Sequence, residues 1–138
     1  MSSYMIESYD TYNRKMNNRP IKILVADDDT SILEVIDLML TEEGYIVHTV
    51  SDGEEIYKIE KDLPDLVLLD IWMSGIDGRD ICKYIKGQKH LKGIPVILIS
   101  ANKDTAIIAA ESGADDFIAK PFEMEELLSK VRHFTAKL

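Results

Sequence analysis

The sequence predicts an α/β fold: a doubly wound, five-stranded parallel sheet of the flavodoxin-like (βα)5 type, with helices on both faces. Three observations carry this prediction. Short apolar runs rich in Ile, Val and Leu alternate along the chain with segments of helical periodicity. The strongest runs contain almost no charged residues, which is typical of strands buried on both faces of a parallel sheet. The chain has 138 residues, a length that fits one domain.

Five segments are the expected strands. The first, third and fourth are the continuous runs IKILVA, LVLL and IPVILI, whereas the second and fifth are weaker. In chain order the expected strands cover residues 21–26, 45–50, 66–69, 94–99 and 117–119.

Apolar residues at helical spacing predict a helix after each of these strands. Asp29 is the expected N-cap of the first helix, and Gly44 lies where its C-cap belongs. The last helix carries acidic residues first and basic residues last, an order that complements the helix dipole. The expected apolar stripes are Ile32, Val35, Ile36, Met39 and Leu40; Ile56 and Ile59 in a short helix over 54–61; Ile81, Cys82 and Ile85 between 77 and 86; the Ala- and Ile-rich segment 105–112, closed by Gly113; and Met124, Leu127, Leu128, Val131 and Phe134.

The composition excludes several classes of protein. The chain has 25 acidic and 16 basic residues, a net charge of −9, which disfavours direct binding to DNA or another nucleic acid. The apolar runs are too short to span a membrane, and no signal peptide is apparent. Cys82 is the only cysteine, which suits a reducing compartment, so we expect a cytoplasmic protein. Residues 1–19 stand apart as an N-terminal extension, either a disordered tail or a short extra helix, and residues 20–138 form the domain.

Polar residues follow the expected strands at the edge where α/β proteins bind ligands. Asp27, Asp28 and Asp29 come after the first strand, Asp70 after the third, Ser100 after the fourth and Lys120, followed by Pro121, after the fifth. Crowded carboxylates need a cation, and oxygen ligands favour Mg²⁺ or another hard divalent ion. A carboxylate can act as a nucleophile and form an aspartyl phosphate, whose charge a lysine and a hydroxyl would stabilise.

These residues and their surrounding strings resemble the receiver domains of two-component response regulators. The matching strings are ILVADDD, EEGYIV, SDGEE, PDLVLLDIWMSGIDG, VILISA and GADDFIAKPF, and the resemblance covers residues 20–136. It implies that Asp70 is the phosphoacceptor and that Asp27, Asp28 and the Trp72 backbone carbonyl help to hold Mg²⁺. It further implies that Ser100 and Lys120 contact the phosphate, that Ser100 and the aromatic Phe117 form the switch, and that the Lys120–Pro121 peptide bond is cis.

Four positions depart from the usual pattern of the family. Ser74 stands where a proline is common, and the bulky Trp72 is expected to shield Asp70 from attacking water. The segment from Ser100 to Gly113 is about two residues short, and Phe117 lacks the hydroxyl of the more frequent tyrosine. None of these departures removes a residue of the phosphorylation site.

The sequence therefore predicts a single-domain receiver that acts as a phosphorylation-activated switch or relay. A histidine kinase or histidine phosphotransfer protein would supply the phosphoryl group, and the exposed Leu38 of the first helix would be available to contact it. The chain ends directly after the last expected helix, so we expect output through an unknown partner protein, from a monomer or weak dimer that catalyses only its own phosphorylation and dephosphorylation. Two alternatives stay open: a phosphate-independent scaffold with the receiver fold, and a small hydrolase of the haloacid-dehalogenase type that would use Asp27 as its nucleophile.

Overall fold

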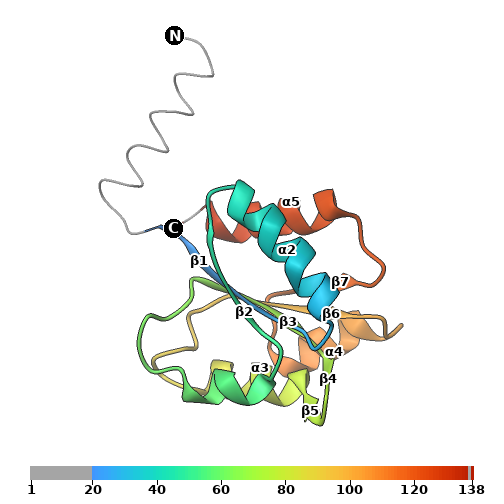
Figure 1. The fold of residues 1–138 in the computed structure, drawn as a ribbon. Coiled ribbons are helices and arrows are strands. Elements are labelled where there is room, and N and C mark those ends of the chain that lie inside the picture. The colour runs from blue at the N-terminus through green and yellow to red at the C-terminus, as the bar shows by residue number, and fades with distance from the viewer. Residues whose placement is uncertain (1–19, 137) are drawn as a thin grey trace.

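The computed structural model describes residues 20–136 and 138, and these contain the expected parallel sheet (Figure 1). Its five strands lie in the order β2-β1-β3-β6-β7, which confirms the doubly wound arrangement. The expected N-terminal extension lies outside the described residues. The strands are β1 (Lys22–Ala26), β2 (Ile46–Val50), β3 (Leu66–Asp70), β6 (Val96–Ser100) and β7 (Asp116–Ala119), close to the expected bounds.

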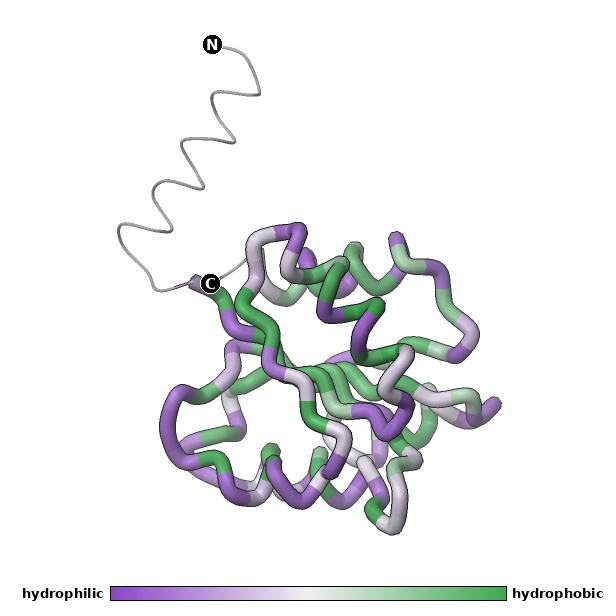
Figure 2. Tube along the Cα trace, viewed as in Figure 1, coloured by the Kyte–Doolittle hydropathy of each residue, from purple (hydrophilic) through white to green (hydrophobic). Residues whose placement is uncertain are grey.

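Helices cover both faces of the sheet because alternate residues of each strand point to opposite faces. In β1, Ile23 and Val25 belong to the core beneath the first and last helices, whereas Leu24 and Ala26 belong to the core on the other face. Figure 2 shows the resulting band of hydrophobic strands between more polar outer layers. One face carries α2 (Thr30–Glu42) and α5 (Met124–Thr135); the other carries α3 (Gly78–Gly87), α4 (Thr105–Ser112) and a 3-10 helix, η1 (Gly53–Lys58).

Most expected helix ends are confirmed. The Asp29 side chain caps α2 by accepting hydrogen bonds from the backbone N–H groups of Ser31 and Ile32. Gly113 ends α4 in the left-handed conformation, with φ of 81°. The C-cap of α2 is Glu43, and Gly44 follows it at a φ of 97°.

The helix expected over residues 54–61 is wrong in type and extent. The segment forms the 3-10 helix η1, which ends at Lys58. Only one of its large side chains, Ile56, is buried. A segment this short makes too few hydrogen bonds and too little apolar contact to hold a regular α-helix.

A small hairpin that the sequence analysis did not predict follows β3. It consists of β4 (Trp72–Met73) and β5 (Ile76–Asp77), paired antiparallel, with Ser74 and Gly75 at its tip. Met73 is 5% exposed and anchors the hairpin in the core. The hairpin therefore projects from the carboxyl end of β3 and is held in place by the buried Met73 side chain.

No helix in the described part of the chain is long and apolar enough to cross a membrane. Cys82 is buried on the inner side of α3, in the core position that its place in the apolar stripe predicted. Burial raises the pKa of the Cys82 thiol to about 11, so the thiol is uncharged at neutral pH.

Candidate functional site

The strand order brings the candidate residues to one edge of the sheet. Strands β1 and β3 are neighbours, and β6 and β7 continue the sheet beyond β3. Asp27 directly follows β1, Asp70 ends β3, Ser100 ends β6 and Lys120 directly follows β7. Because the strands are parallel, all four residues lie at the carboxyl edge, where the sequence placed them.

Three carboxylates gather at this edge. One oxygen from each of Asp27, Asp28 and Asp70 lies within 4.8 Å of the others. Asp27 and Asp70 are buried, at 2% and 6% exposure, whereas Asp28 is exposed. The cluster thus joins two desolvated charges to one that faces solvent.

The Lys120 ammonium bridges the two buried carboxylates. Its Nζ lies 3.0 Å from Oδ2 of Asp27 and 3.4 Å from Oδ2 of Asp70. Burial alone would lower the pKa of Lys120, but the hydrogen bond to Asp27 and the charges of both carboxylates outweigh it and raise that pKa. Lys120 therefore stays protonated and neutralises part of the charge on the cluster.

Asp70 has an acidity unlike that of an ordinary carboxyl group. Burial and then the charge of Asp27 raise its pKa, while Lys120 and a backbone hydrogen bond from Trp72 lower it, and the result is about 6. At pH 7 most of the Asp70 side chains are still ionised, so the group is available as a nucleophile. Burial contributes most to this rise in the Asp70 pKa, and the charge of Asp27 adds to it.

The donor set fits a hard divalent cation. Carboxylate oxygens at close range, in a site with surplus negative charge, are the ligands that Mg²⁺ prefers in proteins. Asp27, Asp28 and Asp70 would hold the ion, and the predicted role of the Trp72 carbonyl as a further ligand stays a prediction. When bound, the ion would neutralise the charge that builds on a transferred phosphoryl group.

The two predicted switch residues lie on neighbouring strands, β6 and β7. Ser100 is 1% exposed, and its Oγ accepts a hydrogen bond of 2.9 Å from the Asn102 N–H, which leaves the hydroxyl hydrogen free to be donated. Phe117 is half-buried on β7, and the Lys130 ammonium lies 5.3 Å from the centre of its ring. Lys120–Pro121 is a cis peptide bond, as the resemblance implied.

Trp72 lies two residues after Asp70, but its indole is 52% exposed. The guanidinium of Arg79 lies over the ring, 4.9 Å from its centre, and forms hydrogen bonds with the Asp77 carboxylate. The expected shielding of Asp70 by this indole stays a prediction, because the ring is half-exposed and lies against the Arg79 guanidinium.

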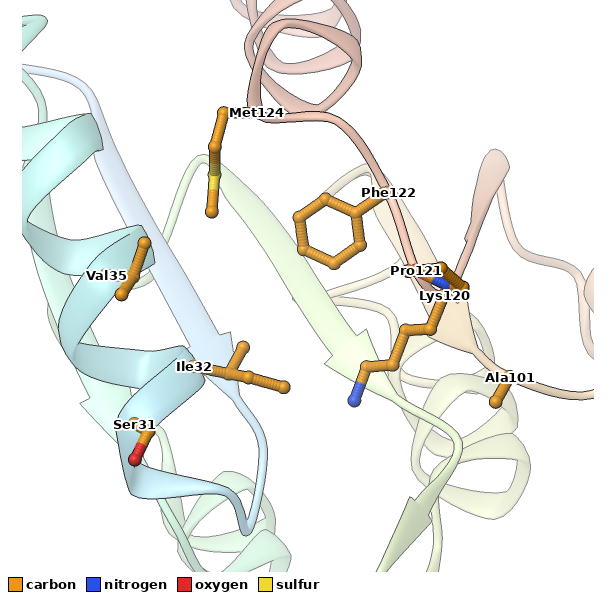
Figure 3. Close-up of a pocket in the computed structure, with 8 residues that line it drawn as sticks. All are labelled: Ser31, Ile32, Val35, Ala101, Lys120, Pro121, Phe122 and Met124. Atoms are coloured by element: carbon orange, nitrogen blue, oxygen red, sulfur yellow. The ribbon is translucent and has the colours of Figure 1, made fainter.

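An apolar pocket of about 510 Å³ adjoins the carboxylates (Figure 3). Ile32 and Val35 of α2 face Phe122 and Met124 across it, and the Lys120 ammonium points into the same space. The pocket connects the outer surface of α2 with the segment that links β7 to α5. Its lining residues are Ser31, Ile32, Val35, Ala101, Lys120, Pro121, Phe122 and Met124.

Two features of the site were not predicted from the sequence. Ser74 was noted only as a departure from a common proline, yet its N–H and its Oγ both donate to Oδ2 of Asp28. Gly78 has no room for a side chain, because a Cβ there would collide with the Asp70 carbonyl oxygen. The pair Asp77-Gly78 could have been predicted as the start of a helix. The contacts of Ser74 with Asp28 and of Gly78 with Asp70 depend on the folded hairpin, so the sequence carries no signal for them.

Comparison with known proteins gives a consistent result. Residues 23–132 match the family model described as response regulator receiver domain. The DNA-binding response regulator MtrA of Mycobacterium tuberculosis is 39% identical over 114 residues, which cover 80% of this chain and 49% of MtrA. The alkaline phosphatase synthesis transcriptional regulatory protein PhoP of Bacillus subtilis is 38% identical over 114 residues, 80% of this chain and 47% of PhoP. The chain thus spans about half the length of these curated relatives.

Solved structures show the same fold. A putative response regulator from Chloroflexus aurantiacus has a TM-score of 0.80 and 35% identity, with 86% of this chain and 99% of that chain covered. The chemotaxis protein CheY4 of Vibrio cholerae has a TM-score of 0.76 and 27% identity, with 83% of this chain and 98% of that chain covered. The flavodoxin-like fold expected from the sequence is the fold of these proteins.

Proposed function

The chain belongs to the response regulator receiver domain family, and we propose that it is a switch or relay that accepts a phosphoryl group on Asp70. The donor is the phosphohistidine of a histidine kinase or histidine phosphotransfer protein, and Mg²⁺ is required. The observation that carries this proposal is the environment of Asp70: a buried carboxylate 3.4 Å from the Lys120 ammonium and within 4.8 Å of two further carboxylates.

The transfer itself is a direct displacement. An ionised oxygen of Asp70 attacks phosphorus, the new P–O bond forms as the P–N bond to the donor histidine breaks, and the imidazole keeps the electron pair of that bond. Lys120 stabilises the negative charge on the phosphoryl oxygens, and the Ser100 hydroxyl donates a hydrogen bond to one of them. The protein acts once on itself, so it is a phosphoacceptor and not a classical enzyme.

Phosphorylation would signal to other proteins by changing the shape of one face of the domain. When Ser100 turns toward the phosphoryl group, Phe117 on the adjacent strand follows it inward, and the face formed by α4, β7 and α5 changes shape. Ile107 on α4 is 58% exposed and is available to a partner on this face. The domain would then control a downstream protein through this face.

The pocket beside Lys120 is the surface that we assign to the phosphodonor. It is apolar, it opens next to the phosphoacceptor, and it includes Val35, which is 48% exposed. Apolar side chains of the donor would pack there and bring its phosphohistidine to Asp70. Leu38, 64% exposed and one turn further along α2, would extend the contact.

A substitution in the pocket separates docking from chemistry. In Val35→Asp, transfer from a phosphorylated histidine phosphotransfer domain should fall roughly tenfold or more, because a charge replaces an apolar contact. Labelling by acetyl phosphate should be unchanged, because this small donor needs no docking surface. Ile107→Asp, at a β-branched residue on α4 that is likewise exposed, is the matched control and should transfer normally; equal loss in both variants would contradict the assignment.

The chemistry is tested with Mg²⁺ and acetyl phosphate. Intact mass should show one acid-labile phosphoryl group that needs Mg²⁺ and is absent from Asp70→Asn. A label that persists in Asp70→Asn but needs Asp27 would favour the hydrolase, although both Asp27 oxygens already accept hydrogen bonds, from the Asp29 N–H and from Lys120. The absence of any label from both acetyl phosphate and a phosphohistidine protein would favour the scaffold.

Several relatives are named as DNA-binding or transcriptional regulators. Our expectation that this chain does not bind DNA directly stays a prediction. It is supported by the net charge of −9, which opposes contact with a phosphate backbone. The test is an electrophoretic mobility shift assay at low salt, with and without acetyl phosphate. Retardation of DNA in either condition would contradict the prediction.

A further inference from the structure

The tip of the β4–β5 hairpin is tied to the acidic cluster by a single residue. The Ser74 N–H donates to Oδ2 of Asp28 at 3.1 Å, and the Ser74 Oγ donates to the same oxygen at 3.0 Å. Among the described residues, no donor reaches the other oxygen, Oδ1, of Asp28. The carboxylate is therefore held at one oxygen and available at the other.

The Asp28 carboxylate is restrained by a different residue from the other two carboxylates of the cluster. Asp27 accepts from the Asp29 N–H and from Lys120, and Asp70 is paired with Lys120. Within residues 20–136, Ser74 supplies every hydrogen bond that the Asp28 side chain accepts. Asp28 is also the exposed member of the cluster, so packing does little to fix its rotamer.

The position of Ser74 is set by the hairpin and does not depend on Asp28. The ladder pairs Trp72 with Asp77 and Met73 with Ile76, and the Met73 side chain is buried in the core. At the open end, Asp77 caps α3 and binds the Arg79 guanidinium, which in turn lies over the Trp72 ring. The hairpin is thus braced at both ends and presents two donors at its tip.

From these contacts we propose that Ser74 is a positioning residue of the metal site. It orients Asp28 with Oδ1 free for Mg²⁺, and it couples Asp28 to the hairpin that carries the Trp72 carbonyl. This inference rests on the proposed function of the site. Groups that hold a metal-binding carboxylate in place commonly contribute strongly to metal affinity.

The residue type matters because the common alternative lacks both donors. A proline has no backbone N–H and no hydroxyl, so it cannot make either hydrogen bond to Asp28. A threonine keeps both, and an alanine keeps only the N–H. The series Thr, Ala, Pro therefore removes none, one and two of the donors.

The experiment measures Mg²⁺ binding directly in the unphosphorylated chain. Mg²⁺ alone is titrated into the protein, and the midpoint is followed by the fluorescence of Trp72, the only tryptophan, and independently by the rise in melting temperature. We expect Ser74→Ala to bind Mg²⁺ about tenfold more weakly and Ser74→Pro at least as weakly, whereas Ser74→Thr stays near the parent. Ser51→Ala, at an exposed serine directly after β2, is the matched control and should bind like the parent.

Two results would overturn the inference. Equal Mg²⁺ affinity in the parent, Ser74→Ala and Ser74→Pro would show that Asp28 needs no support, and tighter binding in the variants would show that Ser74 competes with the metal. Acetyl phosphate labelling at saturating Mg²⁺ separates this outcome from failure of the proposed function. If Mg²⁺ affinity depends on Ser74 as expected, yet the parent takes up no phosphoryl group, the proposed function fails and the role of Ser74 stands.

Discussion

Two of the lysine–aspartate clusters in this domain, one around Lys120 and one around Lys86, differ in charge balance. At the carboxyl edge of the sheet, one ammonium, Lys120, faces two buried carboxylates, with a third nearby. Beside the start of β6, Lys86 faces one carboxylate, Asp115, at 2.7 Å, and also donates to the Ile94 carbonyl at 2.8 Å. Asp115 in turn accepts the Val96 N–H at 2.8 Å.

The second cluster is balanced in charge, whereas the first is not. Lys86 and Asp115 neutralise each other, and each also makes a hydrogen bond with the backbone, Lys86 with the Ile94 carbonyl and Asp115 with the Val96 N–H. At the first cluster one ammonium faces three carboxylates, and burial together with the charge of Asp27 raises the pKa of Asp70. The same residue types thus form a structural bridge where their charges balance, and where they do not they form the site that we propose to be reactive.

Loss of the lysine should have the largest effect at the unbalanced cluster. Lys120→Met should lower the free energy of unfolding of the metal-free protein by about 3 kcal/mol, because it leaves two buried carboxylates unpaired. Lys86→Met should lower it by only about 1 kcal/mol, because Asp115 is more accessible to water and keeps the Val96 N–H. Urea denaturation with and without Mg²⁺ tests this pair. Mg²⁺ should stabilise Lys120→Met more than the parent, whereas Lys86→Met should gain only as much as the parent; an equal gain in both variants would contradict the distinction.

Removal of the Asp70 charge should stabilise the metal-free protein. The carboxyl has a pKa of about 6 in the folded chain against 3.8 as its ordinary value, so the folded state binds more protons between these pH values. The contribution of Asp70 to stability therefore falls as the pH rises through this window, by on the order of 3 kcal/mol. In Asp70→Asn this loss should disappear, which gives a variant more stable than the parent at pH 7.5 and similar to it near pH 4.

The control for this pH effect is Asp115→Asn. Because it leaves Asp70 intact, it should retain the loss of stability between pH 4 and 6. Thermal melts in EDTA across this range provide the measurement. If the difference in stability between the parent and Asp70→Asn did not change through the window, the raised pKa of Asp70 would be wrong.

Binding of Mg²⁺ should stabilise the protein only through the unbalanced cluster. At tenfold excess over the dissociation constant, a ligand of the folded state adds about 1.4 kcal/mol. Asp28→Asn should lose most of this gain, while Asp115→Asn should keep it. Melting temperatures over a Mg²⁺ series measure the effect, and an equal loss in both variants would show nonspecific ion binding.

The smallest expected effect is structural. Asp115→Asn should lower the free energy of unfolding by about 1 kcal/mol, because the amide keeps an acceptor for the Val96 N–H but loses its charged hydrogen bond with Lys86. Phosphorylation by acetyl phosphate should be unaffected. A large loss of phosphorylation in a folded Asp115→Asn variant would mean that the two clusters are coupled.

Much of the fold follows from local patterns in the chain. The buried strands are continuous apolar runs, so β1, β3 and β6 are evident, and helix α2 is marked by its stripe, by Asp29 and by Gly44. The site residues are predictable because parallel strands bring their carboxyl ends together, and Asp70 and Lys120 directly end or follow such strands.

What the sequence did not reveal depends on tertiary contacts. The β4–β5 hairpin has two residues in each strand, too few for any periodic signal. The hydrogen bonds from Ser74 to Asp28 join positions 46 apart in the chain, and they form because the hairpin tip lies against the loop that follows β1. The helix type of η1 was not predicted, because in a short polar segment the choice between an α-helix and a 3-10 helix depends on tertiary packing and not on the spacing of apolar residues.

The most direct test of Asp70 as the phosphoacceptor is to locate the phosphoryl group in the chain. The protein is treated with Mg²⁺ and acetyl phosphate, reduced with borohydride, which converts an aspartyl phosphate to homoserine, and analysed by peptide mass spectrometry, with Asp115→Asn as the matched control. We predict reduction at residue 70 in both the parent and the control, and only after treatment with the donor and Mg²⁺. Reduction at Asp27 or Asp28 instead of Asp70 would contradict the account.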